Sequence, residues 1–345
     1  MWFPCLSRSF SGVDLDAVRL GHPLVDDYLA FLGARVRKNT WLAAAFDLKV
    51  FFCVVAKEPT EVTTADVFAF IAEQRRPRRG PGVVRLEDGE RGLAARTIKR
   101  RLSSVSGLFV YLLTREDIDV RTNPVPKGIG TRAASARPGS GSGALIRTPR
   151  TLPRVLAPGE VSAFAAALRT HRDRAMVAAM LLGGLRRCEV LGLRFGDVNP
   201  GERRLFISEG KGGHQRIVPI SSRFFDALGA YLASERPEDA ETDRLFVALR
   251  GPRRGQPLTS AGVDEVVQSA RIRAGLDRLT CHQLRHTCMT RLREAGMPLE
   301  AVQAQAGHRS IESTRVYLHL ADSWVAEEYM RAIAAVEAGA EGASR

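Results

Sequence analysis

Apolar residues recur at helical spacing in four stretches between residues 21 and 128. The clearest stripe belongs to the fourth stretch, at Ile98, Leu102, Val105, Phe109 and Leu112. Spacings of three and four place these side chains on one face of a helix. Thr63, followed three positions later by Asp66, resembles a capping box at the start of the third helix. Residues 1–20 lack such periodicity and are expected to form a flexible lead. The pattern predicts a small helical domain over residues 21–128.

Two stretches of alternating or β-branched residues interrupt the helical pattern of the second half. They cover residues 203–208 and 215–220, and the Gly-Lys-Gly-Gly run between them is typical of a hairpin. Helical periodicity precedes them, with a buried helix expected over residues 175–182, and dominates afterwards. We predict a second domain over residues 154–337, followed by a tail over residues 338–345. The predicted fold class is mainly α with a small antiparallel β-sheet in the C-terminal domain.

Positive charge is the compositional property that most narrows the choice of partner. The 345 residues include 51 Lys and Arg against 38 Asp and Glu, which gives a formal charge of +13. A polyanionic partner is expected, nucleic acid before an anionic membrane, although charge alone would also fit a solvated basic surface without a partner. Residues 1–150 carry an excess of +9, from 24 basic and 15 acidic residues. On the fourth predicted helix, four basic residues are expected to contact DNA: Arg96, Lys99, Arg100 and Arg101.

Two segments rich in glycine and proline separate the predicted elements. Residues 129–153 contain the run ARPGSGSGA and are expected to form a flexible linker, long enough for a two-domain DNA clamp to close around a duplex. Residues 75–92 lie between the third and fourth helices and are longer than loops in compact domains usually are. This second segment is either disordered or a specific DNA contact, and the sequence leaves both open.

The five cysteines are scattered without CxxC pairing, and their odd number argues against a disulfide framework. A reducing cytoplasm follows, and we expect a cytoplasmic, nucleoid-associated protein. The N-terminus lacks the continuous apolar segment of a secretory signal, and no stretch approaches the ~20 apolar residues that span a bilayer. Cys281 precedes His282, but zinc sites need paired ligands two to four positions apart. No metal and no membrane contact are therefore expected.

Six residues of the second predicted domain form a chemically complete set for attacking a phosphodiester without a metal. They are Arg186, Lys211, His282, Arg285, His308 and Tyr317. A phosphoryl transition state spreads negative charge over its non-bridging oxygens, and planar Arg forks bind such oxygens bidentately. Arg186 and Arg285 fit this task. Glu189, three positions after Arg186, is close enough on a helix to orient it, although a surface Arg paired with Glu at this spacing would look the same.

Four stretches of the second half match a known family in order and spacing. They read GGLRRCEVLGLRFGDV at residues 183–198, GKGGHQRIVPI at 210–220, HQLRHT at 282–287 and AGHRSIESTRVYLH at 306–319. Together they resemble the complete catalytic signature of the tyrosine recombinases, also called phage integrases. Residues 37–51 and the Asn123-Pro124 pair more weakly resemble the family's core-binding domain. The resemblance extends from roughly residue 20 to 335.

The resemblance implies that Tyr317 is the nucleophile. A phenolate can attack phosphorus and leave a covalent phosphotyrosyl link that conserves the energy of the broken strand, so neither ATP nor another cofactor is expected. An isolated Tyr on an apolar helix is usually a packing residue. Tyr317, however, is the only one of the five tyrosines that lies nine positions after a Gly-His pair. Arg186 directly follows Gly-Leu, as the family's catalytic Arg does, which distinguishes it from Arg187.

The resemblance also assigns three residues to proton transfer and phosphate binding. Lys211, in its glycine-flanked hairpin, would give a proton to the departing 5′ oxygen. His282 would assist the proton that leaves Tyr317, and His308 would donate a hydrogen bond to a non-bridging oxygen. His286 and His282 superficially resemble a zinc-binding helix, but no Glu lies between them as in HExxH. We interpret His286 as structural.

These observations predict a site-specific DNA recombinase that acts on double-stranded DNA, with a homotetramer assembled on two DNA sites as a hypothesis. Two alternatives stay open. A type IB topoisomerase would use a similar set of residues but rejoin the same strand. A non-catalytic helix-turn-helix regulator would use residues 280–319 only to read a groove, which leaves Arg186, Lys211 and Tyr317 without a reason for their order. The target sequence and the involvement of accessory DNA-bending proteins cannot be read from the chain.

Overall fold

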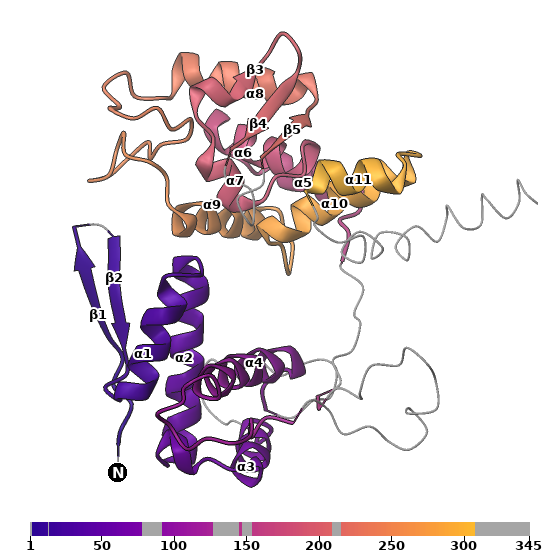
Figure 1. Cartoon of the computed structure of the whole chain (residues 1–345). Coiled ribbons are helices and arrows are strands. Elements are labelled where there is room, and N and C mark those ends of the chain that lie inside the picture. The colour runs from indigo at the N-terminus through magenta and orange to yellow at the C-terminus, as the bar shows by residue number, and fades with distance from the viewer. Residues whose placement is uncertain are drawn as a thin grey trace, which may run out of the picture. The chain divides into compact units, whose positions relative to one another are not determined.

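The chain divides into two compact units, residues 1–150 and 151–345 (Figure 1). The computed structural model describes residues 2–12, 14–77, 92–126, 145–146, 154–208 and 215–307. The boundary between the units falls within the predicted linker. Two residues of that linker are described, Leu145 and Ile146, and both pack against the core of the first unit.

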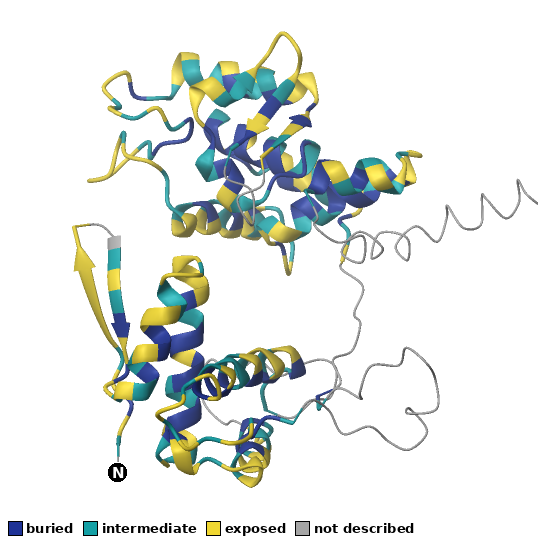
Figure 2. Cartoon of the chain, viewed as in Figure 1, coloured by how far each residue is buried: buried dark blue, intermediate teal, exposed yellow. Residues whose placement is uncertain are grey.

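In the described part of the first unit, four helices surround one hydrophobic core. They are α1 (Pro23–Gly33), α2 (Lys38–Val55), α3 (Thr64–Gln74) and α4 (Ala95–Leu112), with a 3-10 turn, η1, at Pro59–Glu61. α2 contacts the other three helices. The five apolar residues of the predicted stripe on α4 are all buried, and Figure 2 shows that face of α4 turned inward. The helical prediction for this unit is confirmed.

The start of α3 follows the sequence pattern in atomic detail. The Thr63 hydroxyl accepts a hydrogen bond from the Asp66 amide at 3.4 Å, and the Asp66 carboxylate accepts one from the Thr63 amide at 2.9 Å. Each side chain thus satisfies an amide that the first turn of the helix leaves without a partner. The predicted capping box is present.

The segment expected to be a flexible lead contains a β-hairpin. β1 (Ser7–Ser11) and β2 (Asp14–Arg19) pair in antiparallel register, with an irregularity after Ser9. The Trp2 indole anchors the chain before the hairpin, because it donates to the Leu20 carbonyl at 3.2 Å and packs at 4.9 Å from the Phe52 ring. The structure differs here from the expectation, since strands this short, with β1 exposed along its whole length, carry too little periodicity to be recognised.

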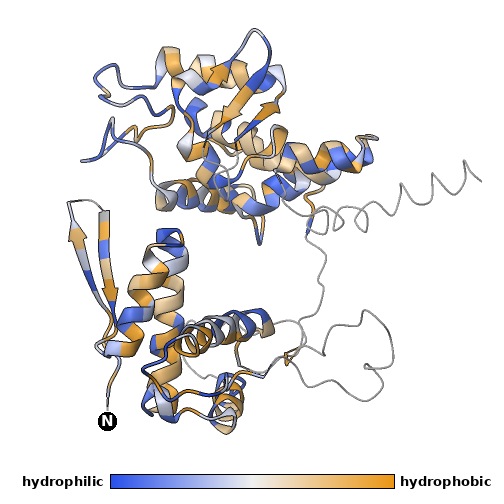
Figure 3. Cartoon of the chain, viewed as in Figure 1, coloured by the Kyte–Doolittle hydropathy of each residue, from blue (hydrophilic) through white to orange (hydrophobic). Residues whose placement is uncertain are grey.

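The second unit, over its described residues, consists mostly of helices around one three-stranded sheet. Its helices are α5 (Pro158–Ala166), α6 (His171–Leu182), α7 (Arg187–Gly192), α8 (Ser222–Ser234), α9 (Ser260–Arg273), α10 (Cys281–Glu294) and α11 (Leu299–Ala306), with a 3-10 turn, η2, at Phe195–Asp197. Buried residues occur on all sides of α6, which contacts both α8 and α10. Figure 3 shows hydrophobic positions concentrated where these elements meet.

The sheet of the second unit is antiparallel, with strand order β3-β4-β5. The strands are β3 (Val198–Asn199), β4 (Arg204–Ile207) and β5 (Arg216–Pro219). Leu205 pairs with Val218, and both are fully buried. The predicted turn between β4 and β5 includes residues 209–214, which lie outside the described part of the chain. A mainly α fold with a small antiparallel sheet in the second unit is confirmed, and the hairpin of the first unit adds a sheet that was not predicted.

Candidate active site

A tight turn between α6 and α7 places Arg186. Gly184 has a φ of +67°, a left-handed conformation that side chains disfavour, and a Cβ there would lie 1.8 Å from the terminal methyl of Met289. Leu185 is fully buried, and its amide donates to the Ala179 carbonyl at 3.1 Å. Arg186 then stands at the N-cap of α7. The Gly-Gly-Leu-Arg run is thus required by the backbone path that turns this arginine into the site.

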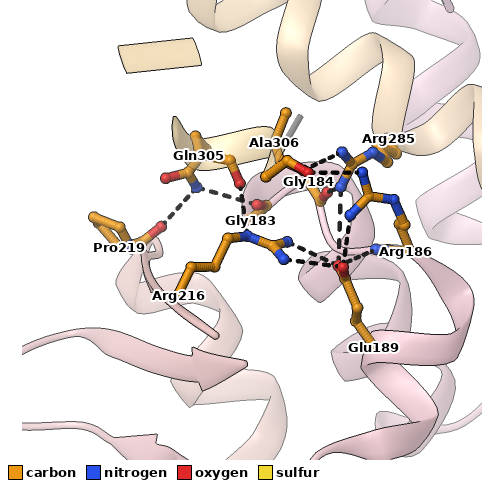
Figure 4. Close-up of polar contacts among 10 residues, drawn as sticks. Gly183, Gly184, Arg186, Glu189, Arg216, Pro219, Arg285, Gln305 and Ala306 are labelled. Carbon is orange, nitrogen blue, oxygen red and sulfur yellow. Dashed lines mark hydrogen bonds and ion pairs between the residues drawn. The ribbon is translucent and has the colours of Figure 1, made fainter. Parts of the chain in front are cut away.

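The buried carboxylate of Glu189 is the centre of the site (Figure 4). Its side chain has no exposed surface. Arg186 donates to it twice, from the backbone amide at 2.9 Å and from Nη1 at 2.7 Å. Arg216 binds both carboxylate oxygens through Nη1 at 2.9 Å and Nη2 at 2.8 Å. Nη1 of Arg285 lies 3.9 Å away. One carboxylate therefore organises three guanidinium groups from α7, β5 and α10.

The electrostatics of this cluster keep Glu189 ionised. Burial by itself raises the pKa of the carboxyl, but the hydrogen bonds and charge of Arg216, together with Arg186, outweigh burial and lower its pKa to about 2. The three arginines bring more positive charge than one carboxylate neutralises. The cluster therefore keeps a net positive charge.

The carbonyl end of α11 faces the same three arginines. Successive carbonyl oxygens accept from them: Gln305 from Arg216 Nε at 3.2 Å, Ala306 from Arg285, and Gly307 from Arg186 Nη2 at 3.2 Å. A helix carries partial negative charge at its C-terminal end, so cations are stabilised there. This contact joins α11 to α7, β5 and α10 at one point.

The Gln305 side chain makes a second set of contacts that fix the end of α11. Its amide nitrogen donates to the Gly183 carbonyl at 3.1 Å and to the Pro219 carbonyl at 3.0 Å. These two carbonyls belong to the turn before α7 and to the end of β5, as Figure 4 shows. Gln305 thus links the end of α11 to the turn before α7 and to β5, the segments that carry Arg186 and Arg216.

α10 contributes Arg285 and two histidines. Arg285 is 1% exposed and donates to the carbonyls of Gly184 and Ala306. His282, one turn earlier, is exposed, and its ring contacts that of His286 at 4.2 Å between centroids. Burial, followed by the nearby His282 and Arg285, lowers the pKa of His286 to about 4. His286 is therefore neutral near pH 7, which agrees with a structural role.

The remaining predicted residues of the site, Lys211, His308 and Tyr317, lie outside the described part of the chain. Gly307, the last described residue, immediately precedes His308. The structure thus brings Arg186 and Arg285 to one place, and the roles of all six residues stay predictions. Within residues 154–208 and 215–307, no group of three His, Cys, Asp or Glu side chains is arranged to hold a metal ion.

The basic residues of α4 in the first unit differ in how they are held. Arg96 and Lys99 are exposed. Arg100 is half exposed and donates to the buried Asp47 carboxylate at 2.6 Å. The Arg101 side chain is 15% exposed and hydrogen-bonds Gln74. Arg101 therefore makes structural contacts inside the first unit. The sequence instead predicted a DNA contact for this residue.

Two residues of the cluster were missed by sequence reasoning. Arg216 and Gln305 hold Glu189 and the end of α11, yet neither belongs to the predicted catalytic set. A signal for Arg216 was present, because side chains two apart on a strand share a face and Arg216 is two positions before the buried Val218. A charged residue on the inward face of a short strand should have indicated a buried ion pair. Gln305 carries no such signal.

Comparisons with known proteins place the second unit in a defined class. The model of the phage integrase family matches residues 154–323. The chain is 31% identical over 277 residues to tyrosine recombinase XerD of Corynebacterium glutamicum, which covers 76% of this chain and 80% of that protein. It is 33% identical over 189 residues to tyrosine recombinase XerC of Corynebacterium efficiens, covering 53% of this chain and 59% of that protein. The chain belongs to the tyrosine recombinase family.

A solved structure supports the fold assignment over most of the chain. The Tn1549 transposon integrase in complex with transposon right end DNA superposes with a TM-score of 0.67 at 18% identity, covering 90% of this chain and 98% of that chain. At this identity the likeness establishes the fold alone. Among the described helices, none is both long and apolar enough to span a bilayer.

Proposed function

We propose that this protein is a site-specific DNA recombinase that cuts and rejoins strands through a 3′-phosphotyrosyl intermediate on Tyr317. The observation that carries the proposal is the convergence of Arg186 and Arg285 on the ionised Glu189 beside the end of α11. Two guanidinium groups held by buried contacts form a preorganised site for a phosphate whose negative charge grows during reaction.

In the proposed cleavage step, the Tyr317 oxygen attacks the scissile phosphorus, and the bond from phosphorus to the 5′ oxygen breaks. His282 assists removal of the phenolic proton, and Lys211 protonates the departing 5′ oxygen. Arg186, Arg285 and His308 bind the non-bridging oxygens. In the second step, the 5′ hydroxyl of a partner strand attacks the phosphotyrosine and releases Tyr317. The phosphodiester is conserved, so the sequence of steps consumes no ATP.

The proposed substrate is double-stranded DNA, bound by a homotetramer assembled on two sites. The +13 charge and the exposed Arg96 and Lys99 support a DNA partner. The Tn1549 integrase with a related fold was solved in complex with DNA, which supports the same assignment here. The tetramer follows from the need to exchange strands between two duplexes.

The test uses nicked suicide substrates made from DNA around the boundaries of the protein's own gene. Wild type and Tyr317→Phe are incubated with labelled DNA, and covalent adducts are sought on a denaturing gel. Tyr329→Phe, a phenol twelve positions later in the chain, is the matched control. We expect an adduct with wild type and Tyr329→Phe and none with Tyr317→Phe.

A further assay separates recombination from topoisomerase activity. Exchange of strands between two differently labelled duplexes supports the recombinase, whereas relaxation of supercoils without exchange would support a type IB topoisomerase. Tight site-specific DNA binding without any covalent protein–DNA adduct would contradict the proposal. It would favour the non-catalytic helix-turn-helix regulator instead.

A further inference from the structure

Arg216 makes three side-chain hydrogen bonds within the arginine cluster, although it belongs to no predicted catalytic set. It is the first residue of β5, and its side chain is 12% exposed. Its two terminal nitrogens bind both oxygens of Glu189 at 2.9 and 2.8 Å, and its Nε donates to the Gln305 carbonyl at 3.2 Å. A planar fork on a carboxylate fixes orientation as well as distance. Arg216 therefore fixes the orientation of Glu189 together with Arg186, which also donates to both oxygens.

Arg186 and Arg216 share the carboxylate of Glu189. Arg186 is thereby held in place while only some of its N–H donors are in use. Arg186 makes one side-chain hydrogen bond to Glu189, through Nη1, and one to the Gly307 carbonyl, through Nη2. A guanidinium has five N–H donors. In the part of the chain that the structure describes, these contacts occupy two of them. The remaining donors are suited to a phosphate.

Without the fork of Arg216, each oxygen of the fully buried carboxylate would keep only one hydrogen bond, from the amide or the Nη1 of Arg186. A buried charge with an incomplete set of hydrogen bonds is costly, and the nearest other cation bonded to it is Arg186. Arg186 would then turn both terminal nitrogens toward Glu189, away from an incoming ligand. The position of the phosphate-binding donors thus depends on Arg216.

We propose that Arg216 is a positioning residue: it holds Glu189 so that Arg186 presents its free donors to the scissile phosphate. This inference rests on the proposed function, in which Arg186 binds that phosphate. Arg216 does not contact the reacting atoms in this role. Its effect passes through Glu189 to Arg186.

A change at Arg216 could also slow cleavage in a second way, and an experiment can tell the two apart. Arg216 lies five positions after Lys211, so a change there could disturb the proposed general acid instead. A substrate with sulfur in place of the 5′ bridging oxygen distinguishes the routes, because a thiolate leaves without being protonated. A defect in protonation is relieved by sulfur, and a defect in phosphate binding is not.

The experiment measures single-turnover cleavage and DNA affinity for full-length wild type, Arg216→Lys, Glu189→Gln and the double variant. Arg216→Lys keeps the charge and removes the bidentate fork. We expect a cleavage rate lower by about 100-fold, as for a small displacement of a catalytic group, with DNA affinity unchanged. The oxygen and sulfur substrates should slow by the same factor. In the Glu189→Gln background, Arg216→Lys should cause little further loss, since both changes act on one path.

Two controls complete the design. Arg172→Lys changes another buried arginine of the second unit, which binds the Asp173 carboxylate at 2.7 and 3.0 Å. This variant should have a lower Tm. At temperatures below its unfolding transition, it should cleave DNA at the wild-type rate. Lys211→Ala is the reference for relief by sulfur. A wild-type rate in Arg216→Lys, or relief of its defect by sulfur, would overturn the positioning role. No adduct from DNA-bound wild type would instead refute the proposed function, and the positioning role with it.

Discussion

Replacing Glu189 by Gln tests the electrostatic account of the site directly. The substitution keeps the shape of the side chain and removes its charge. Arg186 and Arg216, whose side chains are only 18% and 12% exposed, would then lose the charged carboxylate that both of them bind. Breaking a buried ion pair by removing one partner is strongly destabilising. We expect the second unit to lose stability.

The magnitude follows from the pKa of Glu189. The pKa falls from an ordinary value of 4.5 to about 2 in the folded protein. The difference, at about 1.36 kcal/mol per pH unit, corresponds to about 3 kcal/mol of stabilisation at neutral pH. In a unit of this size each kcal/mol shifts Tm by about 2–4 °C, so Tm should fall by about 6–12 °C.

The pH dependence has a definite sign. Since the pKa of Glu189 is lower in the folded than in the unfolded state, the stabilisation is fully present above about 4.5 and is lost as the pH falls toward about 2. Wild type should therefore lose about 3 kcal/mol across this window that Glu189→Gln does not lose. The two proteins should converge in stability at the acid end.

Scanning calorimetry of the full chain measures this with an internal reference. The transition of the first unit should stay in place, and that of the second unit should move. Two results would refute the view that Glu189 is an ionised, strongly stabilised carboxylate. One is a Tm of the second unit that is the same in Glu189→Gln and wild type at pH 7. The other is an equal loss of stability in the two proteins as the pH is lowered.

Three further predictions concern other parts of the molecule. Gly184→Ala should destabilise the second unit by about 1–2 kcal/mol or more, because of its positive φ and the approach of a methionine side chain; calorimetry measures the loss. Cys188 is exposed, whereas burial raises the pKa of the 3%-exposed Cys288 to about 12, so an alkylating reagent followed by mass spectrometry should label Cys188 in the native protein and Cys288 only after unfolding. Lys99→Gln should reduce the slope of log K for DNA binding against log salt concentration by about one unit, which binding titrations at several salt concentrations measure. Arg101→Gln should instead lower the Tm of the first unit, which calorimetry measures.

Helical periodicity predicted the helices of both units because it reports which face is buried. The stripe of α4 from Ile98 to Leu112 is the clearest case. Periodicity does not report what a polar residue contacts. Arg100 and Arg101 follow one another in the chain, and only the fold decides that Arg101 turns to Gln74 and that Arg100 keeps half its surface in solvent.

Two arginines of the cluster were named from the sequence, whereas the Arg216 and Gln305 side chains and the backbone groups that hold them were not. Arg186 and Arg285 were named from their residue type and order, and the turn at Gly184 places the first of them. The carbonyls of Ala306 and Gly307 accept from the same arginines, but a carbonyl is present at every residue and has no signature in the sequence. The cluster is therefore richer than the six residues that define the motif.

The three arginines that hold the end of α11 also set a limit on reach. Gly307 is fixed by its hydrogen bond to Arg186, and ten peptide units separate it from Tyr317. A fully extended chain of this length spans at most about 36 Å, and a helical one about 15 Å. From this anchor the Cα of Tyr317 can lie only within that radius, so its phenol can reach only a phosphate within that radius plus the length of the side chain, whether the phosphate is bound by its own arginines or by those of a second copy. The anchored end of α11 thus fixes one end of the ten-residue segment that carries Tyr317.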